Sequence, residues 1–279
     1  MNDAKLRRIW IVADDYGIAP GVSAAIRDLI ARGRINATSV MVGTPSFSAD
    51  EAAALAAAAA AGRGAIGLHV TLTAPFRPLA AGFAPLRGDA FPPLQAMAGR
   101  ALAHWLKPAP LKAEILRQFA AFRAAFGRPP DFVDGHQHIH VFPQIREALV
   151  AATMEQAPGA WLRQCGRAAA APKSLADPKG IVLDLLSARL RRLAARRGLR
   201  TNPAFAGTYS FAPGADFRKL FPDFLDGLPD GGLIMCHPGK VDAELRRLDP
   251  LTDLREAEYA YFLAAGFPQL LSARGYALA

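Results

Sequence analysis

Short apolar runs alternate with segments of helical spacing along most of the chain. The first run, 9–12, reads Ile-Trp-Ile-Val without interruption, as expected for a strand covered on both faces, and a loop is expected at 14–20. Apolar residues then recur at helical spacing over 22–30, and Gly33 is expected to end that helix. A strand followed by a helix is the repeating unit of parallel sheets.

The same alternation continues to the C-terminal part of the chain. Further strands are predicted at 39–42, 66–73, 132–133, 161–164 and 233–236. Further helices are predicted at 50–61, 115–126, after Pro143, and at 181–197, 216–228 and 253–265. About seven such units predict a single α/β domain over 1–279, folded as a distorted (β/α) barrel with about seven strands.

One segment, from about 74 to 110, interrupts this alternation. It contains many Pro, Gly and Phe residues. Long insertions after a strand often cover the active face of a barrel. We therefore expect this insertion to cover a substrate.

The N-terminal apolar run and the two cysteines indicate where the protein is expected to be located. The apolar run near the N-terminus is too short for a signal-peptide core or a membrane span, so export is not expected and a cytoplasmic location is predicted. The two cysteines, Cys165 and Cys236, are far apart in sequence. They suggest neither a disulfide framework nor a cysteine-rich zinc site, and we expect both thiols to be reduced.

The net charge of +9 comes largely from arginines, six of which lie between 189 and 200 on a predicted helix. This stretch lacks the interleaved aromatic residues of a nucleic-acid groove, so a solvated helix face is the favoured interpretation and no nucleic-acid partner is expected. Peripheral contact with an anionic membrane or a lipid-linked substrate is the alternative. A homodimer is compatible with the sequence.

Candidate chemistry begins with two adjacent aspartates, Asp14 and Asp15, directly after the first predicted strand. Active sites of α/β proteins collect at the carboxyl ends of the strands. Two neighbouring carboxylates repel each other unless a cation, a shared proton or a helix N-terminus relieves the repulsion. The pair therefore indicates a metal ligand beside a base, with a pair of turn or capping aspartates as the alternative.

Histidines follow two other predicted strands. His69 lies on the third strand, within reach of the aspartate pair if the strand order holds, although a lone histidine is also common as a buried polar residue. His136, His138 and His140 alternate after the next strand and would point to one side of an extended backbone. Imidazole is a common metal ligand, so this clustering predicts a metal site, with a structural polar cluster as the alternative. Asp134 is placed to orient a ligating ring.

Two further residues lie at predicted strand ends. His237 follows the strand 233–236 and is a candidate general acid, with an ordinary loop histidine as the alternative. Arg163, at the end of the strand near 161–164, is a candidate for binding a sugar hydroxyl or an acetyl oxygen, or else for a structural salt bridge. His104 lies on a predicted helix and receives no functional role.

Taken in order, these segments resemble the YdjC-like carbohydrate deacetylases, a family that includes chitooligosaccharide deacetylases and hopanoid-associated deacetylases. The resemblance extends from Ile9 to about Ala277. The segments that carry it are Ala13-Asp14-Asp15-Tyr16-Gly17, Gly67-Leu68-His69, Asp134-Gly135-His136-Gln137-His138-Ile139-His140 with Phe142-Pro143-Gln144, and Cys236-His237-Pro238. The ordered set is specific, whereas each motif alone is not.

The resemblance implies a distorted β/α barrel that holds one divalent metal ion. By position, Asp15, His69 and His136 look like the metal ligands. Asp14 looks like the catalytic base, and His237 looks like the acid. The ligand types fit zinc and the family also allows magnesium, so the predicted cofactor is one divalent ion, either magnesium or zinc.

The resemblance also bears on substrate contacts. Tyr16 stands where a phenylalanine is often found, and Tyr16, Arg163 and His138 are the candidate substrate-binding residues. His138 and His140 match the family's histidine-rich segment but are not expected to be metal ligands.

The predicted function is a metal-dependent hydrolase that removes an N-acetyl group from an amino sugar, either an oligosaccharide or a glycolipid headgroup, giving acetate and a free amine. An amidohydrolase-type metal hydrolase acting on another amide is one alternative. A non-catalytic protein that binds saccharides is another.

Overall fold

The centre of the structure is one sheet of parallel strands. The computed structural model describes residues 6–169, 178–210 and 214–279. Its strands are β1 (Arg7–Tyr16), β2 (Ala37–Val40), β3 (Ala65–Val70), β4 (Phe132–Gly135), β5 (Trp161–Leu162), β6 (Phe205–Ala206), β7 (Leu233–Cys236) and β8 (Tyr276–Leu278). Within the described residues their order is β5-β4-β3-β2-β1-β7-β6, and β8 pairs with β1.

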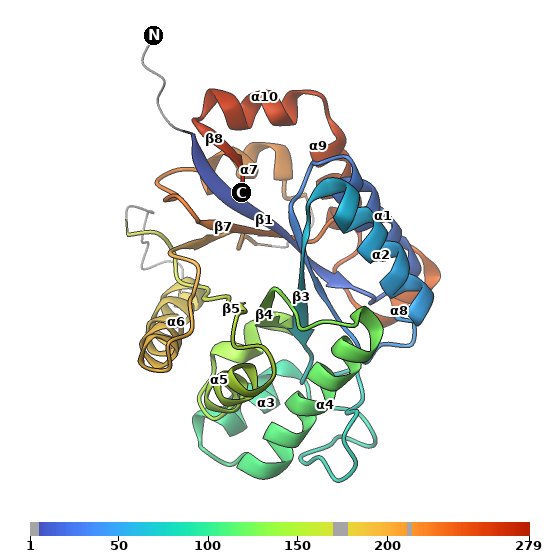
Figure 1. Cartoon of the computed structure of the whole chain (residues 1–279), viewed down its shortest axis with the longest axis vertical. Helices are drawn as coiled ribbons and strands as arrows, with labels where there is room; N and C mark the ends of the chain where they lie inside the picture. The colour runs from blue at the N-terminus through green and yellow to red at the C-terminus, as the bar shows by residue number, and fades with distance from the viewer. Residues whose placement is uncertain (1–5, 170–177, 211–213) are drawn as a thin grey trace.

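Helices surround this sheet (Figure 1). They are α1 (Pro20–Ala31), α2 (Ala49–Gly62), α3 (Leu94–Leu102), α4 (Pro108–Phe126), the 3-10 helix η1 (His136–Val141), α5 (Ile145–Gln156), α6 (Pro178–Arg196), α7 (Phe217–Phe224), α8 (Ala243–Leu248), α9 (Asp253–Leu263) and α10 (Gly266–Ala273). Among the described residues, no helix is both long and apolar enough to cross a bilayer.

The two ends of the strand order approach each other. Leu162 of β5 forms an isolated parallel bridge with Thr201, just before β6, and its backbone N–H donates to the Arg200 carbonyl at 2.9 Å. The sheet therefore curls into a distorted, incompletely closed barrel. This confirms the predicted fold class.

β1 is longer than the sequence pattern predicts. The strand continues through Tyr16, which pairs with Val40 of β2, so the loop expected from residue 14 begins later. The apolar run ends at residue 13, but hydrogen bonding to β2 continues beyond it. The change from apolar to polar residues therefore predicted too early an end for β1, because the two aspartates are buried rather than exposed.

Several short elements were not predicted. The insertion contains α3, and the C-terminal part contains α8, α10 and β8, while α7 is shorter than the helix predicted at 216–228. These elements are short, and a two-residue strand such as β6 leaves no periodic pattern. A buried carboxylate fastens the insertion to α4: Glu114 accepts a hydrogen bond from the Ala80 backbone N–H at 2.7 Å.

Gly67 lets β3 and β4 pack closely against each other. A Cβ atom at Gly67 would lie 2.5 Å from the Phe132 ring, and that ring is buried and stacks on Trp161 at 4.4 Å between centroids. The ring therefore has little freedom to move. A close fit at this point keeps β3 in register with β4.

Gly67→Ala is expected to lower the free energy of unfolding by about 1–3 kcal/mol, because it overpacks this contact. The control is Gly99→Ala in α3, where an added Cβ meets no atom within 4 Å. That change should leave stability equal or slightly higher, since alanine favours helix. Urea unfolding of both variants tests this, and equal midpoints for the two would contradict it.

Candidate active site

The two aspartates at the end of β1 both face the site because the strand is irregular there. The pairing of β1 with β2 shifts register between Ala13 and Tyr16, and Asp15 has a φ of 67°. A regular strand would point consecutive side chains to opposite faces. The bulge redirects the chain, as bulges beside active sites often do. Both carboxylates therefore lie in the same buried region.

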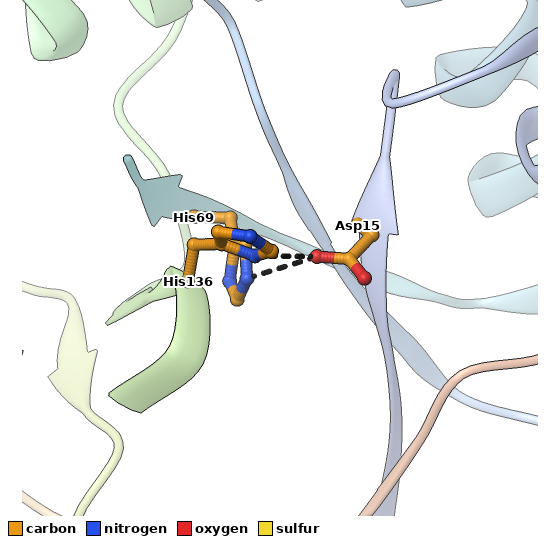
Figure 2. A group of neighbouring side chains, drawn as sticks. All are labelled: Asp15, His69 and His136. Carbon is orange, nitrogen blue, oxygen red and sulfur yellow. Dashed lines mark hydrogen bonds and ion pairs between the residues drawn. The ribbon is translucent and has the colours of Figure 1, made fainter. Parts of the chain in front are cut away.

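Asp15 meets His69 and His136 at one point (Figure 2). Its Oδ1 lies 2.9 Å from His136 Nδ1 and 3.3 Å from His69 Nε2. Ligands of a tetrahedral ion at about 2.1 Å would be separated by roughly 3.4 Å, so these spacings suit a divalent cation. All three side chains are buried, and their donor atoms lie within 4.8 Å of one another. Two imidazoles and one carboxylate leave further coordination positions for water and substrate.

The orientation of His69 is fixed from behind. Its Nδ1 lies 2.6 Å from Asp134 Oδ1 and 3.0 Å from the Ser39 hydroxyl, which leaves Nε2 facing Asp15. A carboxylate behind a ligating imidazole sets the tautomer and raises the basicity of the ring. Burial alone would lower the pKa of His69, but Asp134 and Asp14 outweigh burial and raise it to about 10.

Arg163 holds the second aspartate of the pair. It is fully buried, and its two terminal nitrogens donate to the two oxygens of Asp14, each at 2.6 Å. The same guanidinium forms an ion pair with Asp134 at 2.6 Å. Burial would raise the pKa of Asp14, but the Arg163 charge holds it well below its usual range. Asp14, His69 and Asp134 form a second close group of potential metal ligands. In that group, however, the Arg163 guanidinium already pairs with both carboxylates.

Arg255 holds the remaining oxygen of Asp15, a contact that no sequence pattern indicated. Its Nη2 lies 2.6 Å from Asp15 Oδ2 and 2.6 Å from Asp249 Oδ2. The guanidinium fixes the carboxylate so that Oδ1 faces the imidazoles. Arg255 lies on α9, whose position beside β1 is set by tertiary packing and cannot be read from helical periodicity.

The expectation that the three histidines after β4 point to one side is wrong. The segment forms η1 rather than extended backbone, and Gln137 and His138 have left-handed φ values of 54° and 57°. The rings therefore diverge. His136 reaches Asp15, whereas His140 Nε2 lies 2.9 Å from the Arg163 carbonyl oxygen.

His138 lies beside Phe205 and Cys165. Its ring is 5.5 Å from the Phe205 ring between centroids, and its Nδ1 is 3.5 Å from the Cys165 sulfur. Burial lowers the pKa of His138 and of His140 to about 3, so both rings are neutral. Neither belongs to the group of side chains around Asp15.

His237 directly follows β7, the strand that pairs with β1 on the side away from β2. Its backbone N–H donates to Glu258 Oε2 at 2.6 Å. Burial lowers the pKa of its ring; the Asp15 charge acts in the opposite direction, and the Arg255 charge adds to the lowering. The strand order therefore puts His237 at the same end of the sheet as the aspartate pair.

Tyr16, the remaining sequence candidate, has different surroundings. Tyr16 is buried, and its hydroxyl donates to the Glu51 backbone oxygen at 2.8 Å and lies 2.9 Å from Arg27. These partners are on α2 and α1. From the insertion, the Phe76 ring packs edge-on against the His136 ring at 5.6 Å between centroids, so the insertion reaches the site.

Comparison with known proteins adds to this geometry. A chitooligosaccharide deacetylase of Serratia marcescens is 30% identical over 253 residues, which cover 86% of this chain and 85% of that protein. A chitooligosaccharide deacetylase of Yersinia pestis (strain Pestoides F) is 35% identical over 153 residues, or 54% of this chain, and the match spans 58% of its length.

A solved structure from Enterococcus faecalis V583 superposes with a TM-score of 0.74 at 20% identity, and the match covers 98% of this chain and 97% of that one. At this identity it shows the fold alone. Residues 8–273 match the family described as YdjC-like protein. This match includes β2 to β7 and all of β1 except its first residue, and the resemblance found in the sequence is confirmed. The chain belongs to the YdjC-like protein family.

Proposed function

We propose that this protein is a metal-dependent carbohydrate deacetylase that hydrolyses the N-acetyl group of an amino sugar in a chitooligosaccharide. The observation that carries the proposal is the meeting of Asp15, His69 and His136 around one point, with the Asp14 carboxylate beside it. Relatives named chitooligosaccharide deacetylases supply the substrate class.

The donor set suits one divalent ion held by Asp15, His69 and His136. When bound, such an ion would polarise the acetyl carbonyl and lower the pKa of a water molecule. Two imidazoles with one carboxylate fit zinc by ligand softness, and magnesium is the second candidate.

Asp14 is assigned the role of base. The Arg163 guanidinium keeps this carboxylate ionised and fixes its orientation through two hydrogen bonds. Asp14 takes a proton from the water whose oxygen attacks the acetyl carbon. Because its pKa is depressed, Asp14 is a weak base and depends on a water that is already acidified.

His237 is assigned the role of acid. As the tetrahedral intermediate collapses, the bond between carbonyl carbon and nitrogen breaks, and His237 gives a proton to the departing amine. Acetate and a free amino sugar result, with one water consumed. Since burial favours its neutral form, His237 must gain this proton during the reaction, and the proton that Asp14 takes from the attacking water is the one that balances it.

Arg163 and Tyr16 are not assigned to substrate. Arg163 is fully buried and paired with two carboxylates, which supports the salt-bridge alternative. Tyr16 directs its hydroxyl toward α1 and α2. Phe76 of the insertion is the better candidate for contact with a bound sugar, because its ring already lies against His136.

Acetate release is expected from N-acetylated chitooligosaccharides in the presence of zinc or magnesium, and chelation should abolish it. The screen includes N-acetylated monosaccharides and lipid-linked amino sugars, each assayed with zinc, magnesium, cobalt and manganese in turn. Ring opening of cyclic amides without acetate release would favour the amidohydrolase alternative. Saccharide binding without turnover under every metal would favour a binding protein.

Asp14→Asn should retain the metal and lower the turnover number by roughly 10²- to 10⁴-fold, the usual contribution of general base catalysis. The substitution preserves shape and removes the proton acceptor. Turnover and bound metal are measured on the same preparation. Turnover at the wild-type rate would remove Asp14 from the role of base.

His136→Ala removes a direct donor to the metal. It should therefore weaken metal binding by more than roughly 10- to 100-fold, which is the cost of losing a side chain that only hydrogen-bonds to a metal ligand. His104→Ala is the control, since His104 is exposed. Metal content after dialysis, measured by mass spectrometry, tests the pair. Equal metal content in both variants would exclude His136 as a ligand.

A further inference from the structure

Helix α9 presents two buried charged side chains to the site. Arg255 and Glu258 lie three residues apart, on one face of the helix, and both are fully buried. Arg255 contacts the carboxylate of Asp15. Glu258 contacts the segment that carries His237.

The Glu258 carboxylate is held by two donors. Its Oε2 accepts from the His237 backbone N–H at 2.6 Å, and its Oε1 accepts from the Tyr209 hydroxyl at 2.6 Å. The Tyr209 ring packs against Phe217 and Phe224 at 5.9 and 6.2 Å between centroids. Two hydrogen bonds therefore fix the position of the Glu258 carboxylate, and through one of them the carboxylate fixes the backbone of His237.

The segment after β7 is fastened to α9 at a second point. The Gly239 backbone N–H donates to the Arg255 carbonyl oxygen at 3.0 Å. The short segment from His237 to Gly239 thus makes two hydrogen bonds to the same helix. The helix that orients Asp15 also orients the histidine on the neighbouring strand end.

Burying a carboxylate costs free energy, so the contacts that the Glu258 carboxylate makes are expected to be important. Burial raises the pKa of Glu258 to about 7, while Tyr209 and the His237 N–H lower it in part. The other charged or titratable groups that act on it are Arg255 on α9, Asp14 on β1 and Cys236 on β7. A glutamine would avoid the burial cost but offers only one acceptor oxygen where two donors point.

We infer that Glu258 is a positioning residue for the deacetylation step: it fixes the backbone of His237 so that the imidazole reaches the departing amine. This inference rests on the proposed function. Glu258 itself touches neither the reacting atoms nor the group around Asp15. Its effect should appear in turnover rather than in substrate binding or metal content.

The test compares Glu258→Gln with Glu256→Gln, both loaded with metal. Glu256 lies on the same helix and is exposed, and glutamine can still accept its bond from the Val241 N–H. For Glu258→Gln, we expect kcat on a chitooligosaccharide to fall at least tenfold, with KM and metal content within twofold of wild type. Glu256→Gln should match wild type in all three.

Two results would overturn the inference. One is unchanged kcat in Glu258→Gln. The other is loss of metal and stability with normal kcat for each metal-loaded molecule, which would mean a structural role only. A wild-type protein that releases no acetate under any metal would instead reject the proposed function.

A milder variant covers the case in which Glu258→Gln does not fold. Tyr209→Phe keeps the carboxylate and removes one donor to its charged form, so the pKa of Glu258 should rise further. Ionised Glu258 accepts both bonds, so kcat should fall as pH drops through about 7, and this fall should occur at higher pH in Tyr209→Phe. An identical pH profile in wild type and Tyr209→Phe would count against the inference.

Discussion

The site depends on how two buried arginines divide three buried carboxylates. Arg163 binds both oxygens of Asp14 and one of Asp134, and Arg255 binds one oxygen of Asp15. Buried charges are tolerated only when paired and hydrogen-bonded. The pairing leaves Asp15 Oδ1 as the carboxylate oxygen that faces the two imidazoles. The arginines therefore determine which oxygen is offered to a cation.

The parallel sheet makes this arrangement feasible. All strands that contribute to the site end on the same side, and together they provide three kinds of side chain: carboxylates from β1 and β4, an imidazole from β3, and a guanidinium directly after β5. Because of the bulge in β1, the two consecutive aspartates contact different elements of the fold. Asp14 faces β5, and Asp15 faces β3 and α9.

The sequence predicted the fold class and the segments that meet at the site, because buried strands and the polar residues at their ends leave clear patterns. It could not predict the divergence of the histidines after β4, since that depends on left-handed backbone at Gln137 and His138. Nor could it identify Arg255 and Glu258. Their helix buries these two charged side chains together with apolar ones, so hydrophobic periodicity does not mark its inner face, and only packing shows which residues lie toward the site.

The ion pairs of the site join parts of the chain that are remote in sequence. Arg163 and Asp14 are 149 residues apart, and Arg255 and Asp15 are 240 apart. Bringing residues this far apart in sequence together carries an entropic cost that rises slowly with the length of the loop between them. Until both arginines arrive, the adjacent carboxylates repel each other. A nascent chain released before α9 would lack Arg255, so nothing on that helix would hold Asp15 with one oxygen toward the imidazoles, and the complete centre requires the chain through α9.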